Sequence, residues 1–301
     1  MSSINTNVAA MTALQSLTST NKSLLETQSR ISTGLRVAEA SDNAAYWSIA
    51  TTMRSDKSAL STVQDAMGLG AATVDTAYTG IKAAIDVVDK IKAKLVAARQ
   101  PGVDRTKVQS EIKEFQNELK GIADAASLSG ENWLSVDSSS DNYNATRTIV
   151  ASFSRTNDAV SIGTISIDVA GAKLFDSNDE SGILDTETDD VSVFNLDISE
   201  LTDSDDDIET LEGLISQVDG SIASMTTAAT SLGSAKARIG IQQDFVKSLM
   251  DALDRGIGAL VDADMNEVST KLQALQVQQQ LGIQALSIAN STSQNILRLF
   301  Q

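Results

Sequence analysis

Apolar residues recur with a seven-residue period over long stretches of the chain. Alternate steps of four and three meet an apolar residue at twelve of fourteen positions between residues 49 and 95, and at twelve of fourteen between residues 208 and 253. Such a repeat predicts long helices that pack along one another as a left-handed coil. We therefore expect a mainly α fold of long heptad-patterned helices that form a coiled-coil rod from both chain ends.

Both ends of the chain carry apolar stripes as well. An isolated amphipathic helix cannot bury its own apolar face, and residues 272–297 contain no charged side chain. The stripes favour burial in a larger assembly, with burial in the chain's own core as the alternative. The stripe residues are Ile4, Val8, Met11, Leu14, Leu17, Leu24, Ile31, Val261, Met265, Val268, Leu272, Leu275, Leu286, Ile296 and Phe300.

The limits of the helices follow from capping residues. Gly34 is expected to end the first helix, and Ser41 or Asp42 to cap the second, which spans about 43–100. A Pro-Gly pair ends that helix, and the next is expected to start near Asp104.

The middle of the chain has a different pattern. Residues 147–154, 160–169 and 191–198 form β-branched, partly alternating runs, which predict strands in a small β-rich insertion. Residues 141–220 carry 19 acidic and 3 basic side chains, whereas the flanking sections are nearly neutral. Trp47 and Trp133 are expected to be core residues.

Composition excludes several classes of function. The 301 residues include neither Cys nor His, which removes disulfides, thiol nucleophiles and the commonest zinc ligand and general base. A net charge of −17 argues against nucleic-acid binding, and no apolar run is long enough to insert into a membrane. The acidic pairs of the middle section lack calcium-loop spacing. We expect no cofactor, no metal and no enzymatic activity.

Two segments resemble bacterial flagellins. SRISTGLRVAEASDNAAYWSIA (residues 29–50) is similar to their N-terminal motif, and residues 262–300, with a Gln-Gln pair, Ala-Asn and a final Gln-Asn-Ile-Leu, are similar to their C-terminal tail. The resemblance covers residues 1–135 and 205–301. The Tyr46-Trp47 pair and the compact middle are most similar to flagellins of plant-associated alphaproteobacteria.

The resemblance implies a subunit that self-assembles head-to-tail into the helical filament of the bacterial flagellum. It assigns residues 1–35 with 257–301 to the coiled coil of the filament core. Residues 36–139 with 205–256 become a helical rod with a short hairpin near 132–136, and residues 140–204 an acidic outer domain. It also implies an extracellular location without a cleaved signal peptide. The implied partners are further copies of the chain, an export chaperone, a distal cap protein and the hook–filament junction protein.

The resemblance assigns roles to two further groups of residues. The linker between core and rod, which is expected to contact neighbouring subunits, contains Arg30, Gly34, Arg36 and Asp42. Host innate immune receptors are expected to bind weakly, because the chain departs from the recognised pattern at Tyr46, Lys90 and Lys94, although Glu111 matches a Glu of the same surface. The sequence leaves two alternatives open: a hook–filament junction protein, and a soluble coiled-coil signalling or adhesin module.

Overall fold

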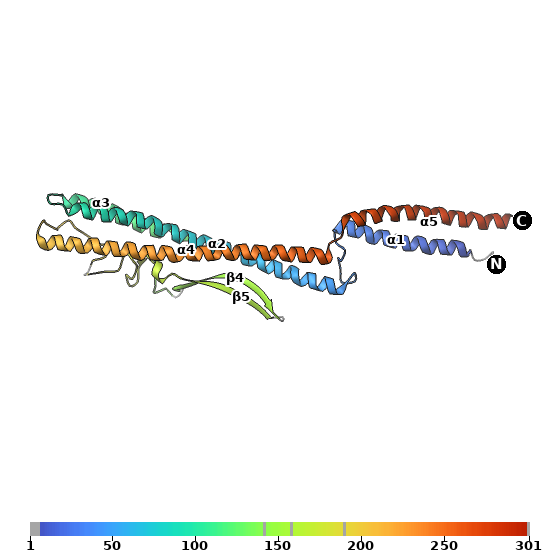
Figure 1. Cartoon of the computed structure of the whole chain (residues 1–301), viewed down its shortest axis with the longest axis horizontal. Helices are drawn as coiled ribbons and strands as arrows, with labels where there is room; N and C mark the ends of the chain where they lie inside the picture. The colour runs from blue at the N-terminus through green and yellow to red at the C-terminus, as the bar shows by residue number, and fades with distance from the viewer. Residues whose placement is uncertain (1–6, 141–142, 157–158, 189–190, 300–301) are drawn as a thin grey trace. The chain divides into compact units, whose positions relative to one another are not determined.

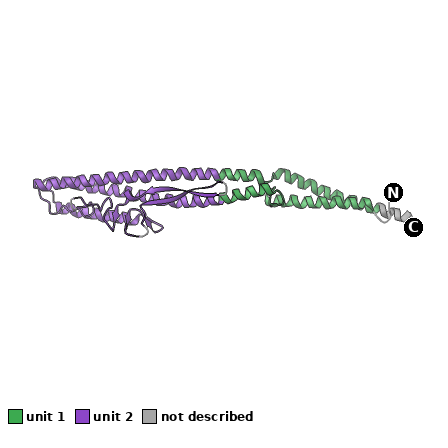
Figure 2. Ribbon diagram, turned by 90° about the horizontal axis from the view of Figure 1, so that it is seen from below, with its two compact units in different colours: residues 1–57, 250–301 green, residues 58–249 purple. Residues whose placement is uncertain are grey.

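The computed structural model is mainly α, as the heptad pattern predicted. It describes residues 7–140, 143–156, 159–188 and 191–299, with side chains described to residue 291. The chain forms two compact units, residues 1–57 with 250–301 and residues 58–249 (Figure 2). The α-helices of the described residues are α1 (Val8–Thr33), α2 (Ala44–Ala98), α3 (Arg105–Ala125), α4 (Asp205–Val261) and α5 (Met265–Leu299) (Figure 1).

The helix ends confirm most of the expected caps. Gly34 ends α1 in the left-handed conformation (φ 72°), and Asp104 accepts the Lys107 N–H at the start of α3. The expected cap of α2 was wrong. Asn43 accepts the Tyr46 N–H at 3.1 Å, while Asp42 turns back to accept backbone N–H groups within the preceding loop. Asn43 stands directly before the first helical residue, which is where a cap must be.

The core of the larger unit lies along the heptad seam of α2, α3 and α4. Ion pairs between α2 and α4 are half exposed and therefore contribute little compared with the apolar seam. Fully buried seam side chains include Met67, Ile81, Ile91, Leu95, Ile112, Leu119 and Leu211.

A buried arginine joins three helix ends. Arg105 donates from Nε to the Ala98 carbonyl oxygen at 3.1 Å and from Nη2 to Asp203 Oδ1 at 2.9 Å. Arg105, at the start of α3, thereby gives a hydrogen-bond donor to a carbonyl group at the end of α2. Its ion pair also fixes Asp203, which lies just before α4.

Two short strand pairs follow α3. β1 (Ser127–Leu128) and β2 (Glu131–Asn132) form a hairpin, and β3 (Ser135–Val136) pairs in parallel with β6 (Phe175–Asp176). The hairpin expected near 132–136 was therefore misplaced by a few residues, because its turn is formed by Ser129 and Gly130, both with positive φ. Trp133 is buried directly after it, as expected.

The strands predicted at 147–154 and 160–169 are confirmed. They form the antiparallel pair β4 (Thr146–Thr156) and β5 (Ala159–Asp168), with a bulge between Val150 and Ser152. The pair lies against α2 and α4. Gln242 of α4 donates to the carbonyl of Ala151 in β4 at 3.1 Å. On α2, a Cβ at Gly70 would lie only 2.6 Å from the side chain of Ile149 in β4, so the helix and the strand are in close contact there. A short 3₁₀ turn, η1 (Ala170–Ala172), leads from β5 toward β6.

The strand predicted at 191–198 was wrong. Those residues form turns, with only Val191 in an isolated bridge. Glutamine side chains take the place of a neighbouring strand. Gln116 Nε2 donates to the Val193 and Leu196 carbonyls at 3.1 and 3.0 Å, and Gln109 both donates to Leu196 and accepts the Ile198 N–H. The apolar residues that suggested a strand, such as Leu196, are buried nonetheless.

Replacing Gln116 with Leu is expected to loosen the 191–198 segment. The carbonyl of Val193 would then be buried without its donor, at a cost of about 1–3 kcal/mol. Amide hydrogen exchange should become faster in 191–198 and stay unchanged in the seam of α2 and α4. Unchanged protection of 191–198 would show that apolar burial alone holds the segment.

Candidate assembly surface

The terminal helices α1 and α5 lie side by side within the smaller unit, with the start of α1 beside the end of α5 (Figure 1). Asn7 donates to the Ala289 carbonyl at 3.0 Å, and Gln279 donates to Asn21 at 2.7 Å. A Cβ at Gly282 would lie 3.2 Å from Leu17, so this glycine lets the two helices approach closely. These contacts define a seam between α1 and α5.

The predicted stripes divide between this seam and the surface. Leu17, Leu24 and Ile31 of α1 are buried or half-buried, as are Val268, Leu272, Leu275 and Leu286 of α5. Val8, Met11, Leu14 and Met265 are instead exposed, so the seam within one subunit does not bury them, and their packing in the filament core stays a prediction. Ile4 and Phe300 lie outside the described residues, as does the side chain of Ile296.

Further apolar side chains on these helices are exposed, and the heptad count had missed them. Val277, Leu281 and Ile288 are spaced by four and seven residues, which places them on one side of α5. At 100° per residue that side is opposite the seam residues Leu275 and Leu286. We call the exposed large apolar side chains described on α1 and α5 the terminal apolar set, and they are between 43% and 67% exposed: Val8, Met11, Leu14, Leu25, Met265, Val277, Leu281, Ile283 and Ile288.

Val261, predicted to begin the C-terminal stripe, belongs to α4 and not to α5. It is the last residue of α4, because residues 262–264 separate α4 from α5. It is buried in a small core with Val37, Ala50 and Ile257. The expected continuous stripe from residue 261 to 300 is therefore broken where the chain passes from one helix to the next.

The linker motif residues make hydrogen bonds within the chain. Arg36 donates from Nη2 to the Leu260 carbonyl at 3.0 Å, where a cation complements the negative end of α4. The Arg30 carbonyl accepts the Gly34 N–H at 2.9 Å. Hydrogen bonds from the Ala38 and Glu39 N–H groups lower the pKa of Asp42. These contacts fix the turn from α1 into α2, and contacts of the motif with other subunits stay a prediction.

Three of the four proposed receptor-surface residues come together between α2 and α3. Lys94 forms an ion pair with Glu111, and the Lys90 Nζ lies 5.7 Å from the centre of the Phe115 ring. Tyr46 lies in the other unit and is exposed. Trp47, expected to be a core residue, is also partly exposed at the surface of α2, so that expectation was wrong.

A buried carboxylate holds the acidic middle section together. Asp176 is fully buried, and burial alone would raise its pKa. Hydrogen bonds from Lys173 at 2.8 Å and from the Ser138 and Asn178 N–H groups instead hold the pKa of Asp176 well below its usual range. Asp185 accepts the Asp176 N–H, and burial raises the pKa of Asp185. The two carboxyl groups therefore respond to acid in opposite ways.

Acid is expected to open this section below about pH 4. The pKa of Asp176 is lower in the folded chain, so its contribution is complete above the unfolded value and is lost as pH falls. The raised pKa of Asp185 gives the opposite, earlier effect, a gain in stability as pH falls toward 4. Asp176→Asn should lower stability at pH 7 by about 2 kcal/mol and flatten the acid limb of thermal unfolding. The exposed Asp137→Asn variant is the control and should follow the native curve.

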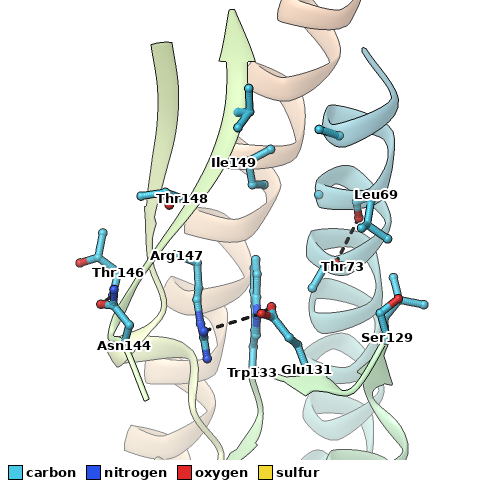
Figure 3. A pocket seen from close by; sticks show the side chains of 14 residues that line it. Leu69, Thr73, Ser129, Glu131, Trp133, Asn144, Thr146, Arg147, Thr148 and Ile149 are labelled. Atoms are coloured by element: carbon cyan, nitrogen blue, oxygen red, sulfur yellow. Dashed lines mark hydrogen bonds and ion pairs between the residues drawn. The ribbon is translucent and has the colours of Figure 1, made fainter. Parts of the chain in front are cut away.

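A cavity of about 550 Å³ lies between α2, the β1–β2 turn and β4 (Figure 3). Arg147 Nη1 lies 3.8 Å from Glu131 Oε1, and the Trp133 ring nitrogen donates to the other oxygen of Glu131 at 3.4 Å. Among the described residues that line it, Glu131 is the only one with a carboxylate. The described lining therefore brings no pair of carboxylates together as acid–base catalysis would require.

The described part of the chain has neither a cluster of metal-ligating side chains nor a membrane-spanning helix. No three acidic side chains there come together as metal ligands would. None of the helices described is both long enough and apolar enough to cross a bilayer.

Comparisons with known proteins agree with this architecture. Residues 4–139 match the family model described as the bacterial flagellin N-terminal helical region, and residues 215–300 match the bacterial flagellin C-terminal helical region. The unmatched residues between them contain the β4–β5 pair and most of the acidic section.

Similar proteins that align with this chain over their full length are flagellins. Flagellin C of Rhizobium meliloti (strain 1021) is 49% identical over 322 residues, and a flagellin of Brucella melitensis biotype 1 is 45% identical over 302 residues. Flagellin A of Rhizobium meliloti (strain 1021) is 43% identical over 396 residues, and each of the three alignments covers 100% of both chains. These relatives confirm the expected alphaproteobacterial type and favour a filament subunit over the junction protein and the coiled-coil module. The chain belongs to the bacterial flagellin family and is a structural subunit of the flagellar filament.

Proposed function

We propose that the terminal apolar set is the surface through which this flagellin polymerises. The observation that carries the proposal is the position of Val277, Leu281 and Ile288, on the side of α5 opposite the seam. The chain's own α1 cannot cover that side, so its burial requires other subunits. Residues 272–297 carry no charge, which removes the desolvation cost that charged side chains would add on burial.

The remaining sections take complementary roles in this proposal. Residues 1–35 and 257–301 form the filament core, residues 36–139 and 205–256 the rod, and residues 140–204 the outer domain. The acidic charge of the middle section supports this arrangement, because outward charge keeps neighbouring filaments apart and in solution. A head-to-tail contact that does not close into a ring gives a helical polymer. The role is structural rather than enzymatic.

The other expected partners are part of the same proposal. An export chaperone would cover the C-terminal apolar residues before assembly, and a distal cap and the hook–filament junction protein would bind the two ends of the polymer. Export without a cleaved signal peptide stays a prediction.

Seeded polymerisation tests the role of the terminal helices. Full-length protein and a chain that lacks residues 1–35 and 258–301 are each mixed with filament fragments and examined by negative-stain electron microscopy. Only the full-length chain should extend the fragments. Extension by the shortened chain would contradict the proposal, and circular dichroism of that chain verifies that its helices are retained.

Recognition by immune receptors is expected to be weak. The Lys94 ammonium is already paired with Glu111, and Lys90, although it lies over the Phe115 ring, lacks the planar fork of arginine. Purified protein should activate reporter cells that carry a toll-like receptor, or a plant flagellin receptor, far less than an enteric flagellin does. Equal activation at equal concentration would contradict this expectation.

A further inference from the structure

The methionines of this flagellin fall into two groups by exposure. Met67 and Met225 are fully buried in the larger unit, and Met53 and Met250 are half-buried. Met11 on α1 is 62% exposed and Met265 on α5 is 43% exposed. Both exposed methionines belong to the terminal apolar set, and Met1 lies outside the described residues.

Exposure of the sulfur controls the chemistry open to methionine. A lone pair on sulfur attacks one oxygen of hydrogen peroxide, the O–O bond breaks, and the oxygen stays on sulfur. The departing hydroxide takes the proton of the new S–OH group and leaves as water, so that a neutral sulfoxide remains. The thioether is thereby oxidised by two electrons to a sulfoxide, and the peroxide is reduced. A buried sulfur such as that of Met67 is protected from this attack.

A sulfoxide changes what Met11 can do at an interface. The product is polar and carries a strong acceptor oxygen, whereas the thioether is apolar and adapts to irregular gaps. Val8 and Leu14, one helical turn to either side of Met11, are also exposed and apolar. A sulfoxide between them would have to be buried without a donor when a second subunit covers this surface.

We propose that Met11 and Met265, near opposite ends of the paired helices, are two reversible oxidation sites that control assembly: peroxide oxidation of the free subunit blocks its addition to the filament, and incorporation into the filament protects both sulfurs. This inference rests on the proposed function of the terminal apolar set. The remaining described methionines are at least half-buried, so we expect peroxide to modify chiefly Met11 and Met265.

Oxidation rates test the first half of the inference. Free subunits and filaments are treated with dilute hydrogen peroxide, and each methionine is followed by peptide mass spectrometry. In the free subunit Met11 and Met265 should oxidise at least about tenfold faster than Met67 and Met225. In the filament their oxidation should slow by a similar factor. Equal rates for Met11 in the free subunit and the filament would overturn the inference.

Seeded growth tests the second half. Peroxide should raise the critical concentration of the native protein at least about tenfold, equivalent to about 1.4 kcal/mol, and methionine sulfoxide reductases with dithiothreitol should restore it. The Met11→Leu/Met265→Leu double variant should grow equally well before and after peroxide. Met11→Gln, which places a polar group at the same point, should grow poorly without any oxidant.

The outcomes separate this inference from the proposed function. Native protein that extends seeds equally well after complete oxidation of Met11 and Met265 would overturn the two oxidation sites and leave the polymerisation surface intact. Sensitivity of the double variant to peroxide would overturn them too, because the block would then arise elsewhere. Untreated native protein that fails to extend seeds would overturn the proposed function and this inference with it.

Discussion

Leu14→Asp is expected to stop filament growth while leaving the isolated subunit folded. Leu14 is 54% exposed on α1, so the variant removes no core contact within the subunit. In the filament it would lose about 1.5–3 kcal/mol of apolar burial and place an unpaired carboxylate at an interface, which costs several kcal/mol more. The critical concentration in seeded growth, measured by sedimentation, should therefore rise by at least about 100-fold.

A matched variant separates this effect from the mere addition of charge. Ile162 of β5 is 61% exposed and belongs to the section proposed to face outward. Ile162→Asp should polymerise at the native critical concentration. Normal growth of Leu14→Asp, or failure of both variants, would contradict the assignment of polymerisation to the terminal apolar set.

Gly182→Ala is expected to destabilise the middle section by about 3 kcal/mol. A Cβ at Gly182 would lie 2.6 Å from the Leu174 carbonyl carbon and 2.7 Å from the Phe175 Cα. These are backbone atoms, and they are held by hydrogen bonds such as that from the Leu184 N–H to the Leu174 carbonyl at 3.0 Å. The backbone must therefore move apart, which would disturb the β3–β6 pair as well.

The control for this variant is Gly171→Ala, because a Cβ at Gly171 would meet no atom within 4 Å. Thermal unfolding should be near native for Gly171→Ala and shifted downward for Gly182→Ala. Filament growth should be retained by both, since neither position belongs to the terminal helices. A native melting curve for Gly182→Ala would show that this turn relaxes without cost.

Much of the fold could be predicted from sequence because long helices repeat their signal many times. The step of four and three identifies buried positions such as Leu60, Val74 and Ile91 along α2, and Gly34 marks the end of α1 by its backbone freedom. The β4–β5 pair was predicted for a similar reason, since its β-branched residues extend over two long runs.

The errors have identifiable physical causes. Residues 191–198 have the apolar content of a buried strand, but their backbone groups are satisfied by Gln109 and Gln116, residues that lie far away in sequence. In α5 a single heptad count follows mainly the seam residues such as Leu275, and it therefore missed the opposite side with Leu281 and Ile288. Local spacing also cannot show that Arg36 caps α4, because its carbonyl partner is 224 residues away.

A cryo-electron microscopy structure of the filament grown from this chain would show directly whether the terminal apolar set forms the contacts between subunits. We expect Val8, Met11, Leu14 and the Val277–Leu281–Ile288 side of α5 to be buried against other copies, with residues 140–204 facing the solvent. A filament in which these terminal side chains stay exposed, and in which the acidic section forms the contacts between subunits, would contradict that role for the terminal apolar set.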